Sequence, residues 1–221
     1  MNNVTQTTQT INNAIQNAIQ KALDFLATYG LDKLERALLF GAGILVVLAL
    51  ITGSIEMSQA WFAFLFRWLH VLSGVMWIGL LWYFNFVQIP SILNIPDEQK
   101  LVVSKVLTPT ALFWFRWAAL ATVVTGLILA LMNGYFFSAL LFGLGTWGQP
   151  TYIGFGMWLG LIMAYNVWMI IWPNQQKALG LVAASDEEKK AAARTAMLTS
   201  RFNTMLSIPM LYFMVAAQNV A

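Results

Sequence analysis

The stretch FRWLHVLSGVMWIGLLWYFNFVQIP, residues 66–90, decides the fold, because its length exceeds the ~20 apolar residues that cross a bilayer. It nevertheless contains Arg67 and His70, and His70 is the only histidine of the chain. Lipid cannot satisfy a guanidinium or an imidazole, so such groups face the interior of a helix bundle or a water-filled cavity. The stretch therefore predicts a membrane helix with one polar face.

The composition of the whole chain agrees with this prediction. Hydrophobic residues make up 59% of the 221 residues and charged residues only 10%, which is too apolar for a water-soluble globule. The chain has no cysteine, so disulfides, iron–sulfur clusters and covalent c-type haem are excluded. One histidine also excludes a metal site built from several histidines of one chain. We expect an integral membrane protein with no metal site of its own and no nucleic-acid partner.

Apolar runs of membrane-spanning length recur along the chain. They lie at about 36–55, 60–89, 110–132, 151–173 and 202–219. We therefore predict an all-α fold, a polytopic membrane helix bundle with about five transmembrane helices. The segment 135–147 is ambiguous, because it can prolong the third span, lie in the interface or dip back into the bundle. We see no convincing internal repeat.

The N-terminal segment differs from the rest. From residue 5 to about 29, apolar residues such as Ile11, Ile15 and Ile19 recur at three- and four-residue spacing among Thr, Gln and Asn. We predict an amphipathic interfacial or assembly helix at 1–30 and a transmembrane bundle at 31–221. The polar face carries almost no charge, which makes attraction to anionic lipid a weak explanation. Packing against the bundle, or against the same helix of a second copy, explains the stripe at least as well.

The basic residues suggest an orientation. Apart from Arg67 and Arg116, every Lys and Arg lies before the first span, between the second and third, or between the fourth and fifth. By the positive-inside rule, we expect a bacterial inner-membrane protein with a cytoplasmic N-terminus and a periplasmic C-terminus. In the last of these connections, Ser185 and Glu188 have the spacing of a capping box and predict the start of a helix that continues into the fifth span.

The polar residues of the second span share one face of a helix at 100° per residue. Those on or beside this face are Arg67, His70, Gly74, Trp77, Asn85 and Gln88. Arg116 enters the third span from the cytoplasmic end and reaches the depth of Asn85 and Gln88 if the two spans are antiparallel neighbours. Arg67 and His70 are predicted near the outer leaflet, facing a cavity.

Structural explanations compete with each functional one. Arg67 and Arg116 lie within one to two turns of a membrane boundary, so their charges can snorkel to the headgroups. A lone intramembrane histidine can bridge two helices, and Asn85 and Gln88 can do the same. The eleven methionines show no consistent ligand spacing, and adaptable packing explains them better than copper does.

The run RWLHVLSGVMWIGLLWYFNFVQIP, followed by TPTALFWFRWAALATVVTGLIL, resembles the membrane domain of the bacterial urate hydroxylase family, the urate oxidase N-terminal-like membrane proteins. The matching features run from the His-x3-Gly-x2-Trp-Ile-Gly pattern at His70 to the Thr125-Gly126 pair. The resemblance covers roughly residues 60–135 and extends to the remainder only by helix count.

The resemblance implies a multi-helix membrane domain that acts on urate and is joined to a cytochrome c domain that accepts electrons. These 221 residues contain no such domain, so we expect a truncated form of the family domain. Either a separate cytochrome c accepts the electrons, or the truncated scaffold has another role.

The leading hypothesis is a subunit of a larger membrane complex that binds a small ligand or a redox cofactor, with haem b as the candidate cofactor. His70 would be the axial ligand, proton carrier or hydrogen-bond donor, Arg67 would hold an anion or propionate, and Trp77 would supply a flat wall. Asn85, Gln88 and Arg116 are candidates for ligand contacts. The rival hypothesis is a non-enzymatic structural membrane protein that forms homo-oligomers or supports a partner complex, and the sequence leaves open whether the chain is an enzyme.

Overall fold

The computed structural model describes residues 2–92, 94–144 and 148–220, and every regular element within those ranges is a helix. Contacts divide the chain into two compact units, Met1–Met57 and Ser58–Ala221. The predicted all-α fold is therefore confirmed. The first unit is described here on its own, and the second unit contains the cavity discussed below.

The first unit consists of two helices. Helix α1 (Asn2–Thr28) confirms the helix predicted from residue 5 to about 29, and its apolar stripe of Ile11, Ile15 and Ile19 is exposed within the chain. A turn with Gly30 at φ 84° leads to α2 (Leu34–Ile51), an apolar helix with no buried residue within the chain. The predicted domain boundary at residue 30 falls in this turn and stays a prediction.

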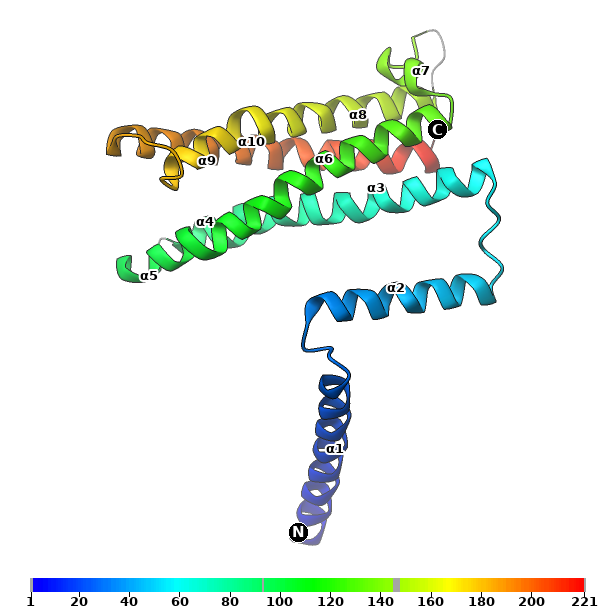
Figure 1. Ribbon diagram of the computed structural model, residues 1–221, viewed down its shortest axis with the longest axis vertical. Coiled ribbons are helices and arrows are strands. Elements are labelled where there is room, and N and C mark those ends of the chain that lie inside the picture. The colour runs from blue at the N-terminus through cyan, green and yellow to red at the C-terminus, as the bar shows by residue number, and fades with distance from the viewer. Residues whose placement is uncertain (1, 93, 145–147, 221) are drawn as a thin grey trace. The chain divides into compact units, whose positions relative to one another are not determined.

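Four long helices build the second unit (Figure 1). They are α3 (Gln59–Trp82), α6 (Thr108–Met132), α8 (Gln149–Tyr165) and α10 (Asp186–Asn219). Helix α3 packs along α6, and α8 packs along α10. The unit is thus two helix pairs that meet, and α3 and α10 touch each other only sparsely.

Shorter elements complete or connect these helices. They are η1 (Tyr83–Gln88), α4 (Ile89–Ile92), α5 (Asp97–Val102), η2 (Val103–Leu107), α7 (Phe136–Leu140), η3 (Asn166–Ile171) and α9 (Trp172–Ala178). Three of them, η1, η2 and η3, are π-helical and continue the long helices rather than standing alone.

Four continuous helices are long and apolar enough to cross a membrane: Leu34–Ile51, Gln59–Ile92, Glu98–Met132 and Gln149–Ala178. They match the first four predicted spans. The fifth run lies in the C-terminal half of α10, which is more polar because it carries Asn203, Ser207 and Gln218. Helix α10 begins at the predicted capping box, with Glu188 N donating to Ser185 Oγ (3.3 Å) and Ser185 N donating to Glu188 Oε2 (2.7 Å).

Each π segment ends two residues before a proline. The amide N–H of the residue before Pro90, Pro109 and Pro173 donates to the carbonyl five residues back, at Phe84, Val103 and Val167. A proline inside a helix has no N–H to donate and its ring clashes with the carbonyl four residues earlier. The turn before each proline is wider than an α-helical turn, which relieves that clash. The carbonyl five residues before the preceding amide then still accepts a hydrogen bond, and this explains the π geometry.

The two helix pairs carry a repeated motif, contrary to the expectation of no internal repeat. Met76-Trp77-Ile78-Gly79-Leu80 of α3 recurs as Met157-Trp158-Leu159-Gly160-Leu161 of α8, and at the same further spacing Asn85 recurs as Asn166. Both motifs run into a π segment and then a proline, and each helix packs along the next long helix. The motif is too short to stand out before the matching helix pairs are seen.

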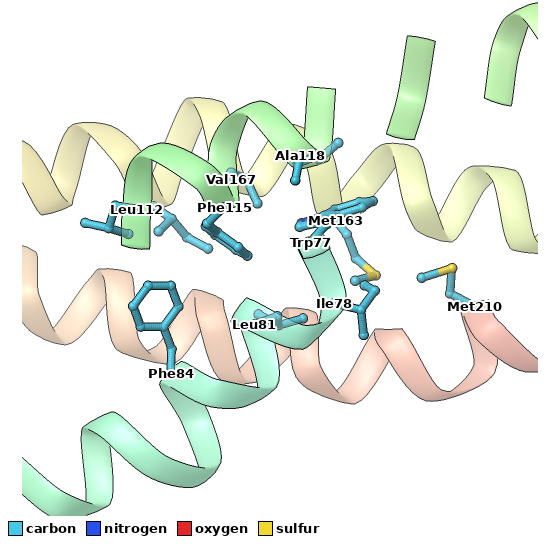
Figure 2. Close-up of a cluster of buried hydrophobic side chains, with 13 residues drawn as sticks. Trp77, Ile78, Leu81, Phe84, Leu112, Phe115, Ala118, Met163, Val167 and Met210 are labelled. Atoms are coloured by element: carbon cyan, nitrogen blue, oxygen red, sulfur yellow. The ribbon is translucent and has the colours of Figure 1, made fainter. Parts of the chain in front are cut away.

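The core of the second unit lies between the two pairs (Figure 2). Phe84 and Phe115 meet edge to face, with ring centroids 5.6 Å apart, and Leu81, Met163 and Val167 are fully buried beside them. Polar side chains also link the helices, because Asn166 Nδ2 donates to Asn203 Oδ1 (2.8 Å).

Residues 135–144, the described part of the ambiguous segment 135–147, neither form a span nor continue α6. After α6 ends at Met132, the short helix α7 folds against α8, where Trp158 Nε1 donates to Leu140 O (3.1 Å). At Gly154, an added Cβ would lie 2.5 Å from Ala139 O, so this contact requires glycine. Residues 145–147 lie outside the described residues.

Candidate functional site

A cavity of about 630 Å³ lies between the four long helices of the second unit. Most lining residues come from 67–82 of α3, 122–130 of α6, 153–161 of α8 and 210–219 of α10. The start of α3, the end of α6, the start of α8 and the end of α10 lie at the same end of the unit as α7 (Figure 1). Trp77, Ile78 and Met210 belong both to the lining and to the buried core. These three residues therefore form the floor that separates the cavity from the packed half of the unit.

His70 projects from α3 against α6. Its Nδ1 lies 2.8 Å from the backbone oxygen of Thr122, and Thr125 Oγ1 lies 3.5 Å from the same nitrogen. A carbonyl oxygen can only accept, so Nδ1 carries the proton and a neutral ring has its lone pair on Nε2. The ring occupies space that Gly126 leaves open, since a Cβ on Gly126 would lie 2.8 Å from His70 Cε1.

Two further polar groups of α3 line the cavity and lack a partner. Arg67 Nε and Trp77 Nε1 are buried and make no hydrogen bond within the described residues. Trp77 is only 1% exposed, so its N–H cannot turn to bulk solvent. A buried unpaired donor costs free energy, on the order of 1–3 kcal/mol. A water molecule reaches neither nitrogen, so both lie beneath the cavity surface, and an acceptor in the cavity would recover this cost only when the side chains shift.

The end of the cavity near α7, called its outer end below, is the more polar one. Tyr135, Gln218 and Asn219 line it together with Arg67. Burial raises the pKa of the Tyr135 phenol, and the nearby charge of Arg67 opposes that rise. The phenol therefore stays protonated and can both donate and accept a hydrogen bond at neutral pH.

The structure brings together only part of the predicted set. Arg67, His70, Gly74 and Trp77 line one cavity, as expected from their shared helical face. Asn85 and Gln88 do not line it: Asn85 Nδ2 donates to Ser200 Oγ (2.8 Å) and Gln88 Nε2 donates to Thr108 Oγ1 (2.8 Å). The reason is their distance along the helix, because both lie about four to five turns beyond His70, on the far side of the core residues Trp77 and Ile78.

Arg116 also lies apart from the cavity. Its guanidinium stacks on Trp172, with Cζ 3.4 Å from the ring centroid, and lies 5.6 Å from the ring of Trp168. Arg116 Nε donates to Leu112 O (3.3 Å). The prediction that Arg116 reaches the depth of Asn85 and Gln88 fits the contact of its neighbour Phe115 with Phe84, but the guanidinium itself contacts the second helix pair. Arg116, Asn85 and Gln88 act as contacts between helices in the structure.

Sequence reasoning missed the residues that other helices contribute. Thr122 fixes the ring of His70, Gly126 makes room for it, and Met157 and Met214 line the opposite wall. The pair Thr125-Gly126 was visible as part of the family resemblance, but its contact with His70 was not. Gly79 and Gly160, the glycines of the repeated motif, both line the cavity.

The arrangement fits a ligand that is largely apolar and carries acceptor groups. The lone pair on His70 Nε2 can accept a proton or bind a metal ion. Metal-binding histidines are commonly oriented by a hydrogen bond from their other ring nitrogen to a carbonyl oxygen, as His70 Nδ1 is by Thr122 O. Methionine sulfur lines the same cavity, and a guanidinium is present for a carboxylate. The donor set is thus compatible with haem and does not require it.

Comparison with known proteins gives one match. The model of the family described as urate oxidase N-terminal matches residues 147–219, about a third of the chain. No curated protein and no solved structure matches. The match confirms the family resemblance, but on α8, α9 and α10 rather than on residues 60–135. The segment that forms one helix pair and one wall of the cavity is therefore similar to the urate oxidase N-terminal family.

Proposed function

We propose that the chain is a membrane subunit that binds a small ligand or redox cofactor in the cavity between α3, α6, α8 and α10. The observation that carries the proposal is the set of unsatisfied groups on one face of α3. Arg67 Nε and Trp77 Nε1 are buried donors without an acceptor, and His70, held by Thr122, lies between them in sequence on the same wall.

Size and lining support the same proposal. Small-molecule sites measure ~300–1,000 Å³ and combine apolar walls with a few placed polar groups. The cavity of about 630 Å³ lies within this range, and its walls are mostly Val, Ile, Leu, Met and Gly. Purely structural membrane helices would fill such a space with side chains, because interiors pack without voids of this size.

Haem b is one candidate occupant. His70 would supply the axial nitrogen, Arg67 would pair with a propionate, and Trp77 would form an apolar wall. The cofactor would supply one-electron redox chemistry, and the chain would hold it, orient His70 and exclude water. Electrons would pass to a separate cytochrome c, and the site would belong to a complex in a bacterial inner membrane.

Urate is the substrate that the name of the matched family suggests. Arg67, Trp77 and His70 offer donors and an acceptor for a planar molecule with carbonyl groups. In this proposal, urate or a related molecule binds the outer, polar end of the cavity.

The absorption spectrum of the purified protein, with and without dithionite, tests the cofactor proposal. A Soret band that shifts on reduction and is lost in His70→Gln would establish His70-dependent haem binding. Arg67→Lys should weaken the same signal because lysine lacks the planar fork that holds a carboxylate. If both variants keep every spectroscopic and ligand-binding property of the parent protein, the proposed site is wrong, and His70 and Arg67 only bridge helices and snorkel.

The structural alternative keeps one specific observation in its favour. Helix α1 presents an exposed apolar stripe. Its first turn has no acidic residue and its last turn has no basic residue. A colourless, ligand-free protein that forms a defined oligomer would support this alternative over the cofactor proposal.

A further inference from the structure

The mouth of the cavity is rimmed by apolar side chains of two helices that barely touch. Val71 and Val75 of α3 line the cavity and are 57% and 67% exposed. Leu211 and Val215 of α10 also line it and are 36% and 62% exposed. The cavity-lining residues of α6 and α8 are less exposed, so the cavity opens between α3 and α10.

This opening lies at the depth of the membrane-spanning segments. Val71 and Val75 fall inside the candidate span Gln59–Ile92, and Leu211 and Val215 lie in the predicted fifth run, 202–219, on α10, which packs along the candidate span Gln149–Ala178. An aqueous entrance at that depth would need polar groups along its rim. A rim of valine and leucine suits a ligand that arrives from the hydrocarbon.

The interior sets a second requirement on the ligand. Trp77 Nε1 and Arg67 Nε need acceptors, and His70 Nε2 can accept a proton from a hydroxyl group. A planar head with carbonyl oxygens supplies the acceptors when oxidised, and its hydroxyl form donates to His70 when reduced. An apolar tail can remain in the lipid by leaving between α3 and α10.

We infer that the cavity takes a membrane-dissolved isoprenoid quinone, which enters sideways from the bilayer between α3 and α10 and hydrogen-bonds to Trp77 and Arg67. The inference deepens the proposed function, because it uses the same cavity and names the class of ligand. It concerns binding and the route of entry, and no electron transfer step is included.

The test is equilibrium binding of a radiolabelled short-chain isoprenoid quinone to the full-length protein in lipid nanodiscs. Val75→Phe narrows the mouth and should weaken binding roughly tenfold or more. Val124→Phe is the matched control, since Val124 is an exposed valine of α6 that does not line the cavity. Trp77→Phe keeps an aromatic wall without the N–H and should weaken binding by roughly three- to tenfold, the loss expected for one hydrogen bond. Val215→Phe repeats the mouth test from α10 if Val75→Phe does not fold.

Three results would overturn the inference. The first is the absence of saturable quinone binding to the parent protein. The second is equal binding by the Val75→Phe, Val215→Phe and Val124→Phe proteins, which would show that the tail of the bound ligand does not lie between α3 and α10. The third is a protein that shows a His70-dependent haem spectrum and binds no quinone. In that case the proposed function stands while the quinone inference fails.

Discussion

At the scale of single residues, His70 is defined by what surrounds it. Its Nδ1 faces the carbonyl oxygen of Thr122 at 2.8 Å, and its ring fills the space above Gly126. Because a carbonyl cannot donate, one tautomer is imposed by the backbone of α6. The chain has a single histidine, so selective labelling of histidine gives one imidazole signal that reports this site directly.

The first prediction compares two glycines near His70. In Gly126→Ala, the new Cβ would lie 2.8 Å from His70 Cε1 and 2.9 Å from Nδ1, so the ring must move and lose its bond to Thr122. In Gly74→Ala, the Cβ would lie 3.8 Å from Thr122 Cγ2, an ordinary contact. Nitrogen NMR of labelled imidazole should show the Nδ1–H tautomer in the parent protein and in Gly74→Ala, and a changed signal in Gly126→Ala.

Both substitutions place alanine in a helix, which by itself favours the helix by ~1 kcal/mol. Gly74→Ala should therefore raise the melting temperature or leave it unchanged, while overpacking at Gly126 costs ~1–3 kcal/mol and offsets the gain. An unchanged imidazole signal in Gly126→Ala would mean that the ring does not lie against α6.

At the scale of elements, helix boundaries were predictable where composition alone decides them. The predicted runs 36–55, 60–89, 110–132 and 151–173 coincide closely with candidate spans, because a long apolar stretch has few alternatives to a membrane helix. The capping box at Ser185 located the start of α10 because two backbone donors there need side-chain partners.

The π segments show where pattern reading fails. Pro90, Pro109 and Pro173 each follow one, yet Pro209 lies inside α10 without any such segment. Proline marks a place where the helix must adjust, and the surrounding packing decides how. Asn85 and Gln88 lie within η1 itself, about four to five helical turns beyond His70, so they lie too far along the helix to line the cavity. Contributions from α6, α8 and α10 were beyond prediction because periodicity within one helix does not encode its neighbours.

The second prediction concerns the N-terminus of α10. Hydrogen bonds from the Ser185 backbone and side chain lower the pKa of Glu188. A carboxylate whose pKa is lowered by folding stabilises the helix end at pH values above its ordinary pKa, and this contribution is lost as the pH falls from that ordinary value through the lowered one. Amide hydrogen exchange in the first turn of α10, corrected for intrinsic rates, should accelerate in that window.

Two variants separate the charge of Glu188 from its hydrogen bond. Glu188→Gln keeps an acceptor for the Ser185 amide and should remove the pH dependence. Ser185→Ala removes the side-chain cap and should speed exchange at every pH, since such a cap contributes ~1 kcal/mol. A Glu188→Gln protein with the same pH dependence as the parent would assign the effect to another group.

At the scale of the whole molecule, the repeated motif accounts for the position of the cavity. Gly79 and Gly160 are equivalent positions of the two helix pairs, and both line it. Sites at the interface between repeats are common in membrane proteins, because the packing there is easily opened. The chain has only one histidine, so the second pair has no counterpart of His70, and the site is asymmetric although the helices repeat.

The last prediction is the orientation of the helices, on which the side of the cavity depends. Apart from Arg67 and Arg116, the basic residues lie before or at the start of α2, between the end of α3 and the start of α6, in α9, or in the N-terminal half of α10, so these positions should be cytoplasmic. A fluorescent reporter fused after Ala183 should fluoresce, and alkaline phosphatase fused after Ala221 should be active. Fusions of alkaline phosphatase after Gly134 serve as a second periplasmic point. The opposite pattern would turn Arg67, Tyr135 and the polar end of the cavity toward the cytoplasm, and a periplasmic cytochrome c could then not approach that end.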